Sequence, residues 1–290
     1  MYIPVLPLKQ NGKLMFPLCR TCCELNISDC SHTEKERYLE GSWVILEVLE
    51  ALKLGYKILK IHEIWHYNEV SHYDTISKQG GIFTPYVNTF LKIKQEASGF
   101  PDWVKNEDDK NKYIKDYVNH EGIQIEKDKI KVNPGLKTLS KLLLNSQLGR
   151  YAMNTDKTKC KFITHPYQLF NLLNNDQFEV TNVLFPNDDV GMCFYTDSKN
   201  MHIGSSQTNV VIAAFVTAQA RIKLYSELRK IDRDIIYCDT DSVFYIKGSY
   251  NPVIGDYLGM FTNEIDPSEG SEIVEFVSAG PKNYSYKLDT

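Results

Sequence analysis

The stretch DIIYCDTDSVFYI, from Asp234 to Ile246, constrains the chain most, because it places two acidic residues inside an apolar run. The run alternates as a β-strand does, so the carboxylates of Asp239 and Asp241 should emerge on one face of one strand. No basic residue stands beside them in the sequence. Two like charges held together are costly unless a proton or a cation neutralises them, and for an oxygen-only site the simplest cation is Mg²⁺. The stretch therefore predicts a magnesium site.

The composition indicates a folded chain that is not a bulk polycation. Of its 290 residues, 42% are hydrophobic and 24% are charged, which suits one large or two small domains. The net charge is −4, so any contact with nucleic acid must come from local basic surfaces. No apolar run reaches the length of a membrane span, and the N-terminus lacks the regions of a signal peptide. We therefore expect an intracellular protein of the nucleus or cytoplasm, with a mitochondrial or viral origin left open, and no membrane partner.

Seven cysteines, four of them between Cys19 and Cys30, argue against a secreted disulfide framework because their number is odd. Cys19-x-x-Cys22 followed by Cys30-x-His32 offers four ligands for a tetrahedral structural Zn²⁺. The alternative is a set of reduced thiols, and Cys23 leaves the choice of zinc ligands open.

Hydrophobic periodicity, capping residues and Pro/Gly punctuation predict helices joined by short extended segments. The helices are expected from Ser31 or Thr33 to Gly55, from Pro85 to Gly99, from Asn133 to about Met153, and from Ala213 to Ile231. Residues 57–67 alternate like a strand, and residues 155–210 carry short strand and turn signals. Residues 102–131 mix both signs of charge, which predicts a solvated hairpin or loop.

The third of these helices carries a polar stripe. Lys137, Lys141 and Asn145 are spaced by four and therefore share one helical face. The opposite face, which we expect to be core, holds Leu136, Leu139 and Leu143. Two lysines in a row suit a polyphosphate better than a single carboxylate, although an ordinary solvated face gives the same pattern. Gly149, late in the helix, favours close approach of another group.

Four segments resemble motifs of family B DNA polymerases and occur in the order of that family. KLLLNSQLG, residues 141–149, is similar to Lys-x-x-x-Asn-Ser-x-Tyr-Gly, and YCDTDS, residues 237–242, is similar to Tyr-x-Asp-Thr-Asp-Ser. TAQAR, residues 217–221, resembles the Thr-x-x-(Gly/Ala)-Arg motif of the protein-primed branch, and PKNY, residues 281–284, resembles its Lys-x-Tyr motif. FPLCRTC, WH and KIKQEASG further resemble viral, organellar and Polinton-like polymerases, so the resemblance spans nearly the whole chain.

The resemblance implies template-directed DNA synthesis on primer-template DNA from deoxynucleoside triphosphates, with a terminal protein as primer in the protein-primed branch. It implies that Asp239 and Asp241 hold catalytic Mg²⁺ ions, and that Lys141 contacts the incoming triphosphate. The residues implied to assist at the nucleotide site are Lys94, Lys137, Asn145 and Gly149. The residues implied to contact the primer and template are Thr217, Arg221, Lys282 and Tyr284.

The chain also departs from the family pattern. Leu148 stands where the family motif has tyrosine or another aromatic residue. No Asp-x-x-Ser-Leu-Tyr-Pro segment, which supplies the family's other main metal ligand, occurs in these 290 residues, and they contain no exonuclease Asp-x-Glu motif. We therefore expect a palm and fingers fragment that is inactive by itself.

Two other functions stay open. DTDSV, residues 239–243, also satisfies the Asp-x-Asp pattern of Mg²⁺-dependent haloacid-dehalogenase phosphatases, although few residues follow it for the α/β domain of that fold. The other alternative is a non-catalytic, DNA-binding polymerase remnant. The fold that we expect is α+β, with an antiparallel palm sheet and a helical fingers hairpin. Its expected divisions are an N-terminal insert with the Cys/His cluster at 1–84, fingers at 85–151 and palm at 152–290.

Overall fold

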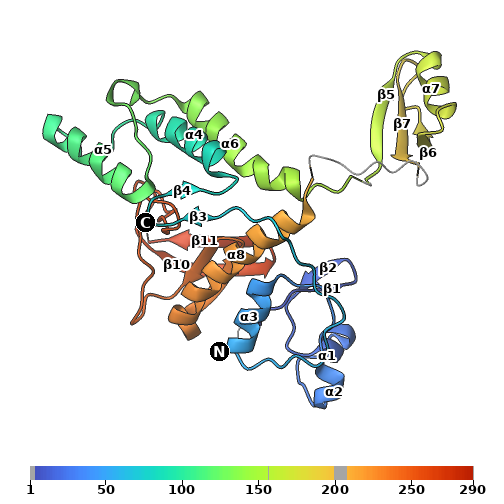
Figure 1. The fold of residues 1–290 in the computed structure, drawn as a ribbon, viewed down its shortest axis with the longest axis horizontal. Helices are drawn as coiled ribbons and strands as arrows, with labels where there is room; N and C mark the ends of the chain where they lie inside the picture. Colours follow the sequence, from blue (N-terminus) through green and yellow to red (C-terminus); the bar gives the residue numbers. More distant parts are fainter. Residues whose placement is uncertain (1–3, 156, 199–207, 290) are drawn as a thin grey trace. The chain divides into compact units, whose positions relative to one another are not determined.

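The computed structural model describes residues 4–155, 157–198 and 208–289, and it divides into two compact units (Figure 1). One unit combines residues 1–145 and 214–290, and the other comprises residues 146–213. Helices and small antiparallel sheets make up the chain, which confirms the α+β class. None of the helices in the described ranges is long and apolar enough to cross a membrane. The division into insert, fingers and palm stays a prediction.

The N-terminal segment consists of short elements. They are β1 (Leu8–Gln10), β2 (Lys13–Met15), α1 (Arg20–Leu25), α2 (Glu34–Arg37), α3 (Ile45–Lys53), β3 (Tyr73–Asp74) and β4 (Gln79–Gly80). The single helix expected up to Gly55 is wrong, because the chain turns extended at Tyr38 and becomes helical again only at Ile45. The indole of Trp43 donates to the carbonyl of Pro7 at 2.9 Å, which holds this extended connection. Thr33 does start α2, through a capping box with Glu36.

The strand expected at residues 57–67 is also wrong. These residues are exposed and belong to no strand of the described chain. Alternation favours a strand only where a neighbouring strand and a half-buried surface receive it, and this segment has neither.

Three helices form a group in the first unit. They are α4 (Thr84–Glu96), α5 (Glu107–Glu121) and α6 (Pro134–Tyr151), with the 3₁₀ turn η1 (Lys127–Lys129) before α6. Figure 1 shows α4 and α6 side by side, and two hydrogen bonds fix their antiparallel direction. The hydroxyl of Tyr86 donates to the carbonyl of Leu143 at 2.9 Å. At the other end, the amide of Asn133 donates to the carbonyl of Ala97 at 2.8 Å.

The loop or hairpin expected at residues 102–131 is wrong, because α5 occupies the centre of this segment. Asn106 caps the helix through a capping box with Asp109, and Gly122 ends it in the left-handed conformation, with φ of 72°. Tyr113 and Tyr117, four residues apart, are buried on one face. They join the core cluster of Leu91, Tyr113, Tyr117, Ile123, Ile125 and Ile130. The charges therefore cover the solvent face of an amphipathic helix.

The second unit contains a three-stranded antiparallel sheet in the order β5-β7-β6, with one helix on it. Its elements are β5 (Lys159–Ile163), α7 (Pro166–Leu173), β6 (Phe178–Leu184) and β7 (Gly191–Asp197). Ile163, Leu172 and Cys193 form its buried core. The short strands predicted for this region are confirmed.

The long helix α8 (Val210–Ile231), followed by the 3₁₀ turn η3 (Asp232–Asp234), is joined to α3 by two ion pairs within the first unit. Arg221 pairs with the buried Glu47, and Arg229 pairs with Glu50. Both pairs attach the N-terminal segment to α8.

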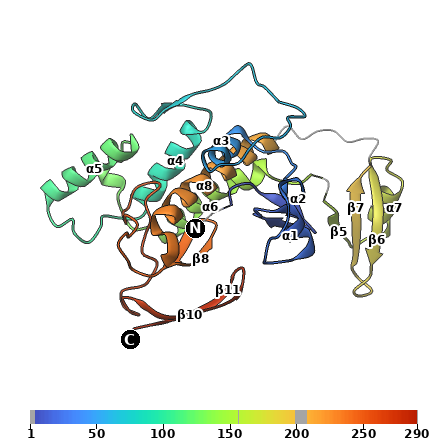
Figure 2. The same ribbon diagram turned by 90° about the horizontal axis from the view of Figure 1, so that it is seen from below.

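The C-terminal part forms two antiparallel hairpins rather than one palm sheet. The first is made by β8 (Ile235–Asp239) with β9 (Ser242–Tyr245). The second is made by β10 (Ile273–Gly280) with β11 (Asn283–Leu288), which are the dark red strands of Figure 2. Aromatic rings join the hairpins, since the ring centroids of Tyr237 and Tyr284 lie 5.2 Å apart and those of Phe244 and Phe276 lie 4.8 Å apart. Side-chain packing, not a shared hydrogen-bond ladder, therefore holds these four strands together.

Candidate functional site

Asp239 and Asp241 lie at the tip of the β8–β9 hairpin. The expectation that both stand on one strand is wrong, because β8 ends at Asp239 and β9 begins at Ser242. Thr240 has a positive φ of 52°, and the amide of Asp241 donates to the carbonyl of Asp239 at 2.6 Å, which closes a tight turn. The turn makes Asp241 exposed and leaves Asp239 half-buried.

A basic residue does stand beside this turn in space. Lys282, at the tip of the β10–β11 hairpin, places its Nζ 3.0 Å from Oδ2 of Asp239. Its amide donates to the hydroxyl of Tyr237 at 2.8 Å. The ammonium of Lys282 and the hydroxyl of Thr240 lower the pKa of Asp239, and Asp239 in turn raises the pKa of Lys282. The cation beside Asp239 is not adjacent in sequence, because it comes from another hairpin.

Tyr284 belongs to the aromatic cluster that joins the two hairpins. Its ring centroid lies 5.2 Å from that of Tyr237 and 5.1 Å from that of Phe244, while 42% of the residue stays exposed. The structure thus brings the segments YCDTDS and PKNY to one place, at the meeting tips of two hairpins.

A second group contains three lysines on two helices. Lys94 is half-buried on α4, and Lys137 and Lys141 are exposed on α6. Burial lowers the pKa of Lys94, and the charges of Lys141 and Lys137 lower it further. Asn145 follows on the same polar stripe and is exposed. The lysines from two motif segments therefore form one cationic group across an antiparallel helix pair.

The leucine face expected opposite this stripe is not core. Leu136 and Leu139 are 41% and 51% exposed, and Ser140 is the only buried residue of α6 within the described chain. The reason is that α4 contacts α6 near Leu143, whereas the described part of the chain leaves Leu136 and Leu139 open to solvent. Periodicity showed which residues share a face but not whether another element covers that face.

The remaining motif residues lie on two helices. A Cβ atom added at Gly149 would meet no atom within 4 Å, so internal packing does not require glycine there. On α8, the hydroxyl of Thr217 donates to the carbonyl of Ala214 at 3.0 Å. The guanidinium of Arg221 is paired with Glu47, so part of its hydrogen-bonding capacity is used within the fold.

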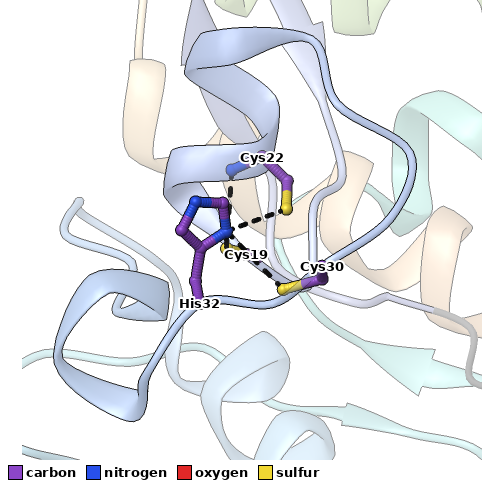
Figure 3. A group of neighbouring side chains, drawn as sticks. All are labelled: Cys19, Cys22, Cys30 and His32. Atoms are coloured by element: carbon purple, nitrogen blue, oxygen red, sulfur yellow. Dashed lines mark hydrogen bonds between the residues drawn. The ribbon is translucent and has the colours of Figure 1, made fainter.

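The cysteine cluster assembles around His32 (Figure 3). Nδ1 of His32 lies 3.6 Å from Sγ of Cys19, 3.3 Å from Sγ of Cys22 and 3.8 Å from Sγ of Cys30. All four ligand atoms lie within 4.8 Å of one another, which is wider than the roughly 4 Å expected from zinc geometry. Among the described residues this is the only group of three or more potential metal ligands, and it leaves out Cys23.

Comparison with known proteins finds a similarity in the central part of the chain. Residues 107–233 match the family model for DNA polymerase type B, organellar and viral. This segment is similar to type B DNA polymerases of organelles and viruses. The motif resemblance is thereby confirmed, while no curated protein and no solved structure matches the chain.

The matched segment includes all of α5, α6 and α8, and with them the motif residues Lys137, Lys141, Asn145, Gly149, Thr217 and Arg221. The hairpins that carry Asp239 and Lys282 lie outside the matched range. The hairpin around Asp239 is antiparallel, whereas the phosphatase alternative needs an α/β domain around that strand. Glu47 and Glu50 were missed as partners of Arg221 and Arg229, because no local signal connects residues so far apart in sequence.

Proposed function

We propose that the chain is the palm and fingers part of a protein-primed type B DNA polymerase that transfers nucleotides to a primer on a DNA template. The observation that carries this proposal is the lysine group on the antiparallel helices α4 and α6, in which burial lowers the pKa of Lys94 and the charges of Lys141 and Lys137 lower it further. In this proposal α4 and α6 form the fingers, and the two C-terminal hairpins belong to the palm.

The physical reason is the mutual repulsion within the lysine group. Like charges held on two packed helices repel one another, and burial of Lys94 adds a desolvation cost. A polyphosphate removes both costs, because its oxygens accept charge-assisted hydrogen bonds from the ammonium groups. We therefore assign the triphosphate of the incoming nucleotide to Lys141, with Lys94 and Lys137 assisting. Asn145 and Gly149 would line the same site.

Asp239 and Asp241 supply the donor type that Mg²⁺ prefers, and one or two carboxylates together with substrate phosphates form a usual ligand set for this ion. The residues therefore fit the ion, although Lys282 occupies one carboxylate oxygen of Asp239. When bound, Mg²⁺ would stabilise the charge on the attacking and leaving oxygens. Lys282 would exchange its contact with Asp239 for the primer terminus, next to Tyr284. Thr217 and Arg221 would contact the template-primer backbone.

Nucleotide binding by the 290-residue chain tests the lysine assignment. A contact with a charged group contributes about 1.5–3 kcal/mol, so Lys141→Gln should weaken binding of a fluorescent deoxynucleoside triphosphate at least about tenfold. Lys115, an exposed lysine of α5, provides the matched control, and Lys115→Gln should leave the affinity unchanged. Equal losses in both variants would show non-specific attraction and remove the assignment.

Primer extension separates the enzyme from the non-catalytic remnant. The 290 residues hold two motif carboxylates without the upstream aspartate, so we expect no detectable extension with Mg²⁺ and nucleotides. A lost stabilising group at a reacting centre commonly costs about 10²- to 10³-fold in rate. A version extended by the family's missing segments should extend a primer, and Asp241→Asn should abolish this activity. An inert extended version that still binds DNA would favour the remnant.

A further inference from the structure

The segment that carries the cysteine cluster has almost no hydrophobic core of its own. Neither α1 nor α2 buries a single residue, and the two helices span six and four residues. Leu14, Leu25 and Ile27 are all more than 40% exposed, whereas Cys19 is buried at 3% exposure. So small a segment needs a cross-link, a metal or a partner surface to hold one conformation.

The distances from the ring nitrogen of His32 to the three sulfurs match a tetrahedral zinc centre, and the four ligand atoms, which lie within 4.8 Å of one another, need to move closer by less than about 1 Å to bind one ion. Zn–S bonds of about 2.3 Å and Zn–N bonds of about 2.0–2.1 Å at tetrahedral angles place sulfur and nitrogen ligands about 3.6 Å apart. The three distances from Nδ1 of His32 to the sulfurs of Cys19, Cys22 and Cys30 are 3.6, 3.3 and 3.8 Å. The ring nitrogen of His32 therefore occupies the place of a fourth ligand.

Backbone hydrogen bonds position the first two sulfurs. Cys19 precedes α1 in an extended conformation, and its sulfur accepts a hydrogen bond from the amide of Cys22 at 3.5 Å. After α1, Asn26 takes the left-handed conformation with φ of 55°, and its amide donates to the carbonyl of Cys22. The chain then returns so that Cys30 and His32 reach the same point (Figure 3). An amide donor to a ligating sulfur also supports its thiolate form.

We propose that Cys19, Cys22, Cys30 and His32 bind one structural Zn²⁺ that holds the N-terminal segment in its conformation. Four protein ligands close the coordination sphere, so the site is structural and not catalytic. The three thiols bind as thiolates and release their protons to solvent. Cys23, although next in sequence to Cys22, lies outside the ligand group and is not a ligand.

The segment that carries the zinc ligands also contacts α8. Phe16, three residues before Cys19, packs edge-on against Tyr225 with ring centroids 6.5 Å apart, and the guanidinium of Arg221 lies 5.8 Å from the Phe16 ring centroid. Zn²⁺ therefore fixes the segment from which Phe16 contacts a residue of the polymerase motif TAQAR.

Metal analysis of the full chain, purified without chelator, tests the ligand set. We expect about one equivalent of Zn²⁺, and after exchange the intense visible absorption of Co²⁺ in a tetrahedral thiolate site. Cys22→Ser should abolish this absorption and lower the zinc content, whereas the matched control Cys23→Ser should retain both. Wild-type protein without zinc that also gives no tetrahedral Co²⁺ spectrum would overturn the proposal, as would equal loss of metal in both variants.

Limited proteolysis of the wild-type chain tests the structural role without relying on a variant that folds. Trypsin cleavage sites at Arg20, Lys35 and Arg37 lie within or beside the coordinated segment. Chelation should make these sites cleavable early, and restored Zn²⁺ should protect them again, while Mg²⁺ should not. Cleavage at an unchanged rate with and without zinc would refute a structural role for the metal.

Discussion

Replacing Arg221 by methionine tests whether its guanidinium stabilises the fold. The side chain of Glu47, its partner, is 5% exposed, and that of Arg221 is 24% exposed. Removing one member of a buried ion pair leaves an uncompensated charge and typically costs about 3–5 kcal/mol. Arg221 keeps partial contact with water, so we expect Arg221→Met to lower the free energy of unfolding by about 2–4 kcal/mol.

Arg229→Met provides an internal comparison. Its partner Glu50 is 12% exposed and keeps a second cation, because Nζ of Lys53 lies 3.1 Å from its Oε2. Arg229 and Lys53 both lower the pKa of Glu50, with Arg229 contributing most. The carboxylate of Glu50 therefore stays partly compensated after the substitution, and we expect a loss of only about 1–2 kcal/mol.

Urea denaturation followed by circular dichroism measures both changes. The double variant Glu47→Gln with Arg221→Met should recover much of the stability lost in Arg221→Met, because no buried charge remains. Stability of Arg221→Met within about 0.5 kcal/mol of the parent chain would refute the reasoning. Such a result, together with weaker binding of primer-template DNA, would assign Arg221 to DNA rather than to the fold.

Three further outcomes are expected. Gly149→Ala should raise stability by about 0.5–1 kcal/mol in thermal denaturation, because alanine favours a helix and its Cβ would meet no atom within 4 Å. The same variant should bind nucleotide on a primer-template more weakly, because the added methyl group hinders the close approach of another group to the helix. Lys282→Gln should raise the pKa of Asp239 toward its ordinary value in an NMR titration. In the parent chain, the Asp239–Lys282 pair stabilises the fold above about pH 3.9, and this stabilisation is lost as pH falls through the lowered pKa of Asp239. Between the lowered pKa of Lys94 and its ordinary value of about 10.4, Lys94 is protonated in the unfolded chain but not in the folded one. The free energy of unfolding should therefore increase as pH rises through this range, and Lys94→Met should reduce the increase.

Short-range sequence features predicted a helix correctly where capping residues, proline and glycine positions and apolar periodicity indicated the same helix. Proline near the start of α4 and a long apolar period in α8 located these helices to within a few residues. Local signals failed for α5, because a mixed-charge surface is common to helices and loops, and only the burial of Tyr113 and Tyr117 distinguishes them. They failed for residues 57–67, because alternation does not supply a partner strand.

The sequence by itself determined which chemistry each short segment carries. The spacing of Lys137, Lys141 and Asn145 places them on one helical face, and Cys19-x-x-Cys22 forms a local turn that points two sulfurs the same way. These relations extend over a few residues, so backbone geometry alone establishes them.

Only the tertiary structure decided which charges meet. Lys282 reaches Asp239 because aromatic packing brings two hairpins together, and Arg221 reaches Glu47 across 174 residues because α3 lies against α8. Lys94 joins the lysines of α6 because hydrogen bonds hold α4 antiparallel to it. Such contacts depend on how distant elements pack, and no local spacing along the chain encodes that packing.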